Sequence, residues 1–172
     1  MKTGDAKTGS KVLEFYKELP FNYRETIKEH VKAIKRQNSV NAYPELQKLL
    51  EKKKTTIFEV GCGVGWLSNA LAYHHKCLVA GLDFNPVAID RAKEISHSLK
   101  TNVDFHVGNL FEFNHESPVD LVVSLGVLHH TGDCTGAVRR VCQEFVKPGG
   151  HVFIGLYHSY GREPFLNHFK QM

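Results

Sequence analysis

The residues best suited to chemistry are three closely spaced glycines in the stretch FEVGCGVG, which runs from Phe58 to Gly65. Glycine adopts positive φ angles without strain and lets a ligand approach the backbone closely. A P-loop is disfavoured because its Gly-Lys pair does not occur in the chain. A dinucleotide fingerprint fits Gly61 and Gly63 and then fails, because Trp66 stands where the third glycine is required. The spacing therefore predicts a ligand-binding turn and disfavours NAD.

Asp83 is the second candidate, because it follows another apolar run, twenty positions after Gly63. A carboxylate at this spacing can accept hydrogen bonds from both hydroxyls of a ribose. A helix cap is the alternative role for Asp83, but Asn85 two residues later already suits that role. The glycines, Asp83 and the strand–turn–helix context together predict a cofactor site.

Two adjacent histidines, His129 and His130, follow a further apolar run at the mouth of this predicted site. A histidine there could accept a proton from a substrate, whereas packing or hydrogen bonding within the loop is the commoner role. Tyr157 and His158 share that position and both possibilities. We treat His129, His130 and Tyr157 as candidate catalytic residues, and His158 as a substrate-side candidate. Cys62 is interpreted as a small filler, since nothing near it in sequence would lower the pKa of its thiol.

Short apolar segments that alternate with helical periods must position these residues. Strand patterns occur in Ile57–Val60, Leu78–Leu82, Val103–Val107, Leu121–Ser124 and Val152–Leu156. Helical spacing recurs between them, and the last of these helices is expected to end at the segment KPGG, residues 147–150. Such alternation predicts a doubly wound α/β fold with a mainly parallel sheet. Ligands bind beyond the carboxyl ends of such strands, which is where the glycines stand.

The residues before the sheet are predicted to be helical. We expect residues 1–10 to form a flexible N-terminus, 11–54 a helical segment that covers the site, and 55–172 the cofactor-binding core. Asn22 with Glu25 matches a capping box that would open the second helix.

An aromatic segment within this predicted cover is a substrate-side candidate. Tyr16, Phe21 and Tyr23 surround a proline break in the sequence FYKELPFNY. As a hypothesis, one or more of them close over the cofactor and shape the substrate pocket.

The composition is that of an ordinary globular chain, with 172 residues, 42% hydrophobic residues and a net charge of +4. Neither a signal-peptide region nor an apolar run of membrane-spanning length is evident, so we expect a cytoplasmic protein without a membrane partner. The cysteines and histidines lack ligand spacing, so we expect no metal. The basic residues are scattered, which disfavours nucleic acid as a partner without excluding it.

From Ile57 to Tyr157 the chain resembles the class I S-adenosylmethionine-dependent methyltransferases. The resemblance is carried by five motifs in order: FEVGCGVG, GLDFNPVAIDRAK, VGNLFEF, VDLVVSLGVLHH and VKPGGHVFIGLYH. It implies a Rossmann-like sheet of order 3-2-1-4-5. It also implies S-adenosylmethionine as the cofactor and S-adenosylhomocysteine as its product.

The resemblance assigns roles along the carboxyl edge of the sheet. The glycine turn borders the methionine part of the cofactor, Asp83 holds the ribose, Phe84 lies along the adenine, and Asn109 with the next N–H reads the adenine edge. Many family members carry Asp in place of Asn109. An amide can still accept from the adenine amino group, so we expect weaker discrimination of the base and not a loss of binding. The predicted cofactor-binding residues are Glu59, Gly61, Cys62, Gly63, Gly65, Asp83, Phe84, Asn109, Leu110, Ser124 and Leu125.

The predicted activity is methyl transfer to a small-molecule acceptor by in-line displacement, which depends mainly on alignment of the two reactants. Family members that methylate amino groups of bases often carry (Asp/Asn)-Pro-Pro-(Tyr/Phe) after the fourth strand. Here that place reads Ser124-Leu125-Gly126-Val127, which resembles the small-molecule branch. An RNA or protein methyltransferase, or a cofactor-binding module without activity, are the alternatives.

The C-terminal residues favour a chain that stops before the family's sixth and seventh strands. Only sixteen residues follow Leu156, and Phe165, Leu166, Phe169 and Met172 predict one short helix among them. The apolar fifth strand would then leave a sheet edge unpaired. We expect a truncated chain, with a homodimer through this edge as the alternative.

Overall fold

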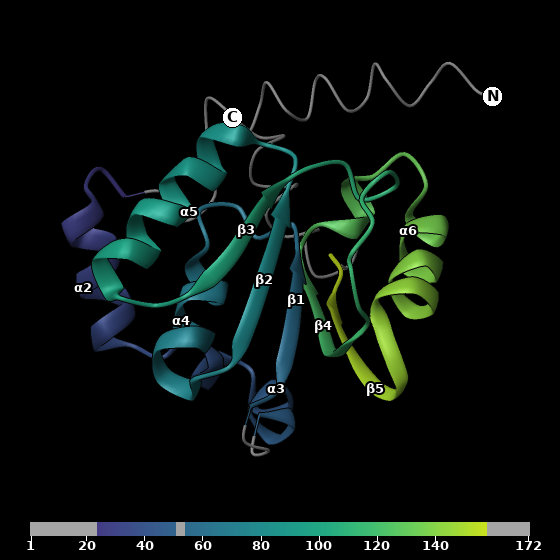
Figure 1. The fold of residues 1–172 in the computed structure, drawn as a ribbon, viewed down its shortest axis with the longest axis horizontal. Coiled ribbons are helices and arrows are strands. Elements are labelled where there is room, and N and C mark those ends of the chain that lie inside the picture. The colour runs from purple at the N-terminus through teal and green to yellow at the C-terminus, as the bar shows by residue number, and fades with distance from the viewer. Residues whose placement is uncertain (1–23, 51–53, 158–172) are drawn as a thin grey trace, which may run out of the picture.

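The computed structural model describes residues 24–50 and 54–157, and its centre is a five-stranded parallel sheet (Figure 1). The strands are β1 (Thr56–Val60), β2 (Leu78–Asp83), β3 (Val103–Val107), β4 (Val119–Leu125) and β5 (Val146–Gly155). Their order is β3-β2-β1-β4-β5, and each neighbouring pair is parallel. The predicted doubly wound fold and the strand order are confirmed.

The strand order fixes where a ligand can meet the sheet. Because the strands are parallel, their carboxyl ends share one edge of the sheet. The chain order reverses between β1 and its neighbour β4, and α/β sheets bind ligands at such a switch point. The glycine turn follows Val60, the last residue of β1, and therefore lies at this point.

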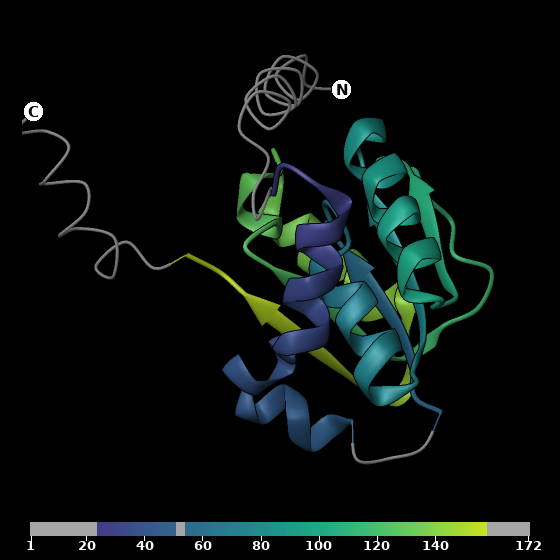
Figure 2. The same ribbon diagram turned by 90° about the vertical axis from the view of Figure 1, so that its left-hand side faces the viewer.

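Helices cover both faces of the sheet. On one face α2 (Ile27–Arg36), α4 (Trp66–His75) and α5 (Pro86–Leu99) contact one another. On the other lie α6 (Cys134–Arg140) and a π-helical turn, Val141–Phe145 (Figure 1). The short helix α3 (Pro44–Leu49) lies near the start of β1, as both ribbon views show (Figures 1 and 2). Among the described residues, no helix combines the length and apolar character needed to cross a membrane.

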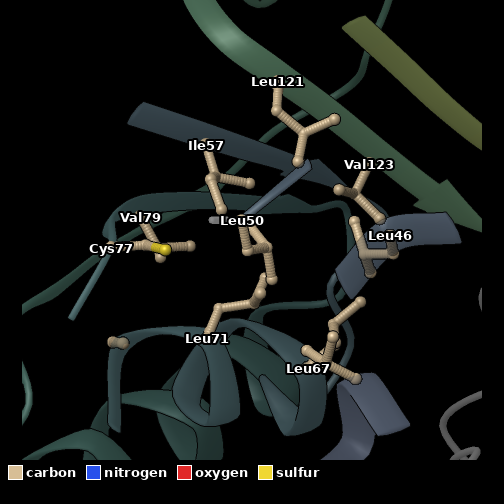
Figure 3. Close-up of a cluster of buried hydrophobic side chains, with 11 residues drawn as sticks. Leu46, Leu50, Ile57, Leu67, Leu71, Cys77, Val79, Leu121 and Val123 are labelled. Carbon is tan, nitrogen blue, oxygen red and sulfur yellow. The ribbon is translucent and has the colours of Figure 1, made fainter. Parts of the chain in front are cut away.

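Alternation along β1 builds a separate core on each face, because successive strand residues point to opposite sides. Ile57 joins an apolar cluster that contains α3 and α4 side chains (Figure 3). Phe58 joins the opposite cluster with Val141 and Phe145. The labelled members of the first cluster are Leu46, Leu50, Ile57, Leu67, Leu71, Cys77, Val79, Leu121 and Val123.

The described part of the N-terminal helical segment packs against the sheet domain, with Leu46 in the first cluster and Ile34 in a further one that includes Ile95 and Leu99 of α5. Ile34 of α2 and Leu46 of α3 are fully buried. The predicted flexible residues 1–10 and the aromatic residues Tyr16, Phe21 and Tyr23 lie outside the described residues.

The predicted capping box of the second helix is wrong by one turn. Helix α2 begins at Ile27, with Thr26 as its N-cap and Glu29 as the reciprocal partner. Both Asn22–Glu25 and Thr26–Glu29 satisfy the pattern, and the box directly before the apolar stripe of the helix is the one used. The predicted cap of α5, by contrast, is confirmed: Asn85 accepts from Val87 and Ala88 N–H groups.

The last strand begins earlier than predicted. Val146 already pairs with Val119, and pairing resumes between His151 and Leu121 after a register shift. Residues 147–150, expected to end a helix, instead form this irregularity, because proline and glycine suit a bulge better than a helix interior. Within the described residues β5 pairs only with β4. The predicted C-terminal helix lies beyond them.

Candidate functional site

The glycine turn is held against the end of β2 by its own backbone. Gly61, Gly63 and Gly65 have φ angles of 75°, 52° and 71°, in the left-handed region that favours glycine. The N–H groups of Gly61 and Cys62 both donate to the Leu82 carbonyl, at 2.7 and 3.1 Å. The turn therefore has a fixed shape in which three glycines are needed for conformational reasons.

The three glycines differ in what surrounds them. A Cβ added to Gly61 would lie 2.4 Å from a Val127 methyl group, and one added to Gly65 would lie 2.7 Å from the Phe105 ring. A Cβ added to Gly63 would meet nothing within 4 Å. Gly61 and Gly65 are therefore required by packing, whereas Gly63 faces open space in which a ligand could lie against the backbone.

Asp83, at the end of β2, is tied to this open part of the turn. One carboxylate oxygen accepts the Gly63 N–H at 2.8 Å, and the other accepts the Asn85 N–H at 2.9 Å. Burial raises the pKa of Asp83, while these N–H donors act in the opposite direction. The sequence indicated a ribose acceptor here but gave no sign of the bond to Gly63. Each carboxylate oxygen has a further lone pair, so the side chain retains acceptor capacity.

Glu59 and Cys62 lie behind the turn. Glu59 accepts a hydrogen bond from the Ser68 hydroxyl of α4, and both residues are buried. Burial raises the pKa of Glu59 to about 8. Burial likewise raises the pKa of the Cys62 thiol, which fits a buried filler. Ser68 was missed because a single serine within a helix carries no sequence signal.

The residues predicted to meet adenine cluster at the ends of β2 and β3. Phe84 is 37% exposed, and Phe111, which the sequence did not single out, is equally exposed. Asn109 is exposed and accepts the Phe111 N–H at 3.0 Å, while Leu110 beside it is buried. Asn109 therefore fixes the short turn after β3. Its predicted contact with adenine would use the hydrogen-bonding capacity of the side-chain amide that the bond to the Phe111 N–H leaves available.

Ser124 and Leu125 end β4 on the other side of the glycine turn. Ser124 is fully buried, and its hydroxyl donates to the Val60 carbonyl at 3.0 Å. This bond joins the carboxyl ends of β1 and β4. Because the hydroxyl is used there, the predicted contact of Ser124 with the cofactor would be made by its backbone. Leu125 is half-buried.

His129, His130 and Tyr157 come together at this side of the mouth. The ring centres of His129 and Tyr157 are 4.3 Å apart, and those of the two histidines are 4.1 Å apart. Tyr157 also lies near Gly126, where an added Cβ would be 3.3 Å from its hydroxyl oxygen. His158 lies outside the described residues. Among residues 24–50 and 54–157, no group of three potential metal ligands occurs.

A family model for a methyltransferase domain matches residues 51–170. The chain belongs to this family. This methyltransferase domain is 30% identical over 112 residues to a ubiquinone biosynthesis O-methyltransferase of Coxiella burnetii, which covers 64% of the chain and 46% of the relative. A protein of the same name from Pseudomonas paraeruginosa is 35% identical over 103 residues, or 58% of the chain and 43% of the relative. The domain thus spans about half the length of the curated relatives it matches.

The fold of the domain also matches solved structures. A methyltransferase from Geobacter sulfurreducens, dependent on S-adenosylmethionine and crystallised with S-adenosylhomocysteine, superposes with a TM-score of 0.59 and 19% identity. The superposition covers 74% of this chain and 53% of that one. With the family match, it confirms the resemblance to class I methyltransferases.

Proposed function

We propose that this methyltransferase domain binds S-adenosylmethionine along the carboxyl edge of its sheet and transfers the methyl group to a small molecule. The observation that carries the proposal is the open side of the glycine turn beside the Asp83 carboxylate. The φ of 52° already favours glycine at Gly63, and a side chain there would also occupy the open space that the ligand needs.

The residues around the turn fit the chemical groups of this cofactor. Asp83 has acceptor capacity for ribose hydroxyls. The exposed Phe84 and Phe111 rings offer apolar surface to adenine. Gly65 caps α4 without a side-chain acceptor, so the N–H groups of the first turn can meet the carboxylate of the amino-acid end. NAD is disfavoured, because Trp66 occupies the place of the third dinucleotide glycine.

The bound cofactor supplies a methyl group that its sulfonium already activates. The residues of the chain then have three tasks: to fix the cofactor, to align the acceptor with the methyl group, and to exclude water. A hydroxyl acceptor must also lose a proton, and the candidates to receive it are His129 and His130, which follow β4. The ring of Tyr157, tilted by 49° against that of His129, would hold His129 in orientation.

The similarity to proteins named O-methyltransferases supports a hydroxyl group as the acceptor. We expect His129→Gln or His130→Gln to lower kcat, with little change in the dissociation constant of S-adenosylhomocysteine. The experiment that tests the function is transfer of label from methyl-labelled S-adenosylmethionine to a panel of phenols, alcohols and amines. Cofactor binding without transfer to any acceptor would favour a binding module without activity.

A second candidate function is methylation of a nucleic acid, favoured by one groove on the flank of the molecule. The groove measures about 550 Å³, lies between α2 and α5, and has an apolar floor that includes Ile27 and Val31. Four cations line it: Lys28, Lys32, Lys35 and Arg36. Binding of a single-stranded RNA that weakens steeply with salt would support this alternative. The charge reversal Lys32→Glu should then weaken RNA binding at a given salt concentration.

A further inference from the structure

Two buried carboxyl groups lie on one face of neighbouring strands, directly behind the glycine turn. Glu59 on β1 stands opposite Gly81 on β2, and Asp83 follows Gly81 by two residues. Side chains two residues apart on a strand point to the same face, so Glu59 and Asp83 share one face of the sheet, where the Phe105 ring and the Cys62 thiol fill the space over Gly81. Glu59 is 6% exposed and Asp83 is 9% exposed.

Both carboxyl groups are bound to elements that shape the predicted cofactor site. Glu59 accepts from the Ser68 hydroxyl in the first turn of α4, and Ser68 itself is fully buried. Asp83 accepts from the Gly63 N–H. A change in the charge of either carboxyl group would therefore act directly on the glycine turn or on the start of α4.

The groups that pair with Glu59 or donate to it are uncharged. Its register partners are Gly81 on β2 and the apolar Val123 on β4, while the hydroxyl and the backbone N–H of Ser68 on α4 lower the pKa of Glu59 by less than burial raises it. The Cys62 thiol lies in the turn near both carboxyl groups. Burial is the main cause that raises its pKa, and the charges of the two carboxyl groups add to this effect. Burial is also the main reason why the pKa of Glu59 is raised to about 8, and the charge of Asp83 adds to this effect.

We propose that Glu59 is a positioning residue that holds a proton in the free protein and releases it when a positively charged ligand binds at the glycine turn. The inference rests on the proposed function, because the positive charge is the sulfonium of S-adenosylmethionine. Burial and the nearby charge of Asp83 both disfavour a charge on Glu59, and the positive sulfonium would offset them. The proton leaves the Glu59 carboxyl for a water or buffer base, and no covalent bond to carbon or sulfur changes.

This proton release makes the site selective between the cofactor and its product. S-adenosylhomocysteine has a neutral sulfur, so it gives no comparable reason for Glu59 to ionise. The ratio of the two affinities should therefore shift toward S-adenosylmethionine as pH rises from 6.5 to 8. One linked proton changes the ratio by at most tenfold per pH unit. We expect at least about a fivefold change across this range.

The test is calorimetric titration of both ligands into the wild-type protein and into Glu59→Gln, at several pH values between 6.5 and 8.5. Measurements in two buffers of different ionisation enthalpy count the protons released. The amino group of each ligand titrates equally with both proteins, so the difference between the proteins isolates Glu59. We expect wild type to release more protons with S-adenosylmethionine than with S-adenosylhomocysteine, and Glu59→Gln to lose this excess.

An equal pH dependence of the affinity ratio in both proteins would overturn the inference while leaving the proposed function intact. If wild type binds neither ligand, the proposed function fails and the inference with it. Should Glu59→Gln not fold, the wild-type proton count decides alone. An excess no larger than that calculated from the amino groups of the two free ligands contradicts the inference. A larger excess supports it.

Discussion

Alanine substitutions at single glycines separate the needs of the fold from those of the ligand. Gly61, Gly63, Gly65 and the distant Gly149 all have positive φ, so alanine carries a backbone cost of about 1–2 kcal/mol at each. At Gly63 and Gly149 an added methyl group meets nothing within 4 Å, so the backbone cost is the whole loss of stability that we expect. At Gly61 and Gly65 it would contact side chains at less than 3.0 Å. Overpacking of this kind adds about 1–3 kcal/mol.

Gly149 is the matched control, because it lies in β5 near the opposite edge of the sheet and has the same backbone cost. We expect Gly63→Ala and Gly149→Ala to unfold in urea at similar midpoints, and Gly61→Ala and Gly65→Ala at clearly lower ones. Calorimetry with S-adenosylhomocysteine should then show at least about tenfold weaker binding for Gly63→Ala only, equivalent to about 1.4 kcal/mol. Equal affinity of Gly63→Ala and Gly149→Ala would refute the placement of the ligand beside Gly63.

Three further substitutions probe single side chains. Asp83→Ala should weaken S-adenosylhomocysteine binding by about 1–3 kcal/mol, measured by calorimetry, because it removes a buried acceptor of hydrogen bonds; unchanged affinity would exclude Asp83 from the site. The raised pKa of Glu59 should make the protein lose up to about 5 kcal/mol of unfolding free energy as pH rises from about 4.5 to 8, since the native state retains a proton that the unfolded state releases. Urea titrations across that range should show a flatter profile for Glu59→Gln, and an equally steep one would contradict the buried acid. Asp120 should act in the opposite sense, because hydrogen bonds from Lys147 and Thr56 lower its pKa. Its contribution to the free energy of unfolding is therefore full above the ordinary pKa range of Asp and is lost as pH falls through the lowered pKa. Asp120→Asn should therefore cost about 1 kcal/mol at pH 7 and much less at pH 2, and equal losses at both values would contradict this account.

The sequence was sufficient to predict the sheet, because each strand is a short apolar run bounded by turns or helices. It also predicted that the glycines and Asp83 lie at the ends of adjacent strands, which the structure confirms, whereas their contact with a cofactor stays a prediction. It did not reveal that only Gly63 faces open space, because Val127 and Phe105, which fill the space at the other two glycines, are distant in sequence.

Where the sequence offered two equivalent local solutions, it could not decide between them. Both Asn22–Glu25 and Thr26–Glu29 match a capping box, and the apolar contacts of α2 select the second. The bulge at the start of β5 depends on pairing with β4, which residues 147–150 do not encode alone. The role of Ser68 is likewise tertiary, because its partner Glu59 lies on a strand nine residues earlier.

The central claim is that the open glycine turn and Asp83 form a site for S-adenosylmethionine and not for a dinucleotide. Isothermal titration of the protein with S-adenosylmethionine, S-adenosylhomocysteine and NAD tests it most directly. We expect saturable binding of the first two, at one site per chain, and no heat of binding with NAD. Saturable binding of NAD, with none of either S-adenosyl compound, would contradict the account.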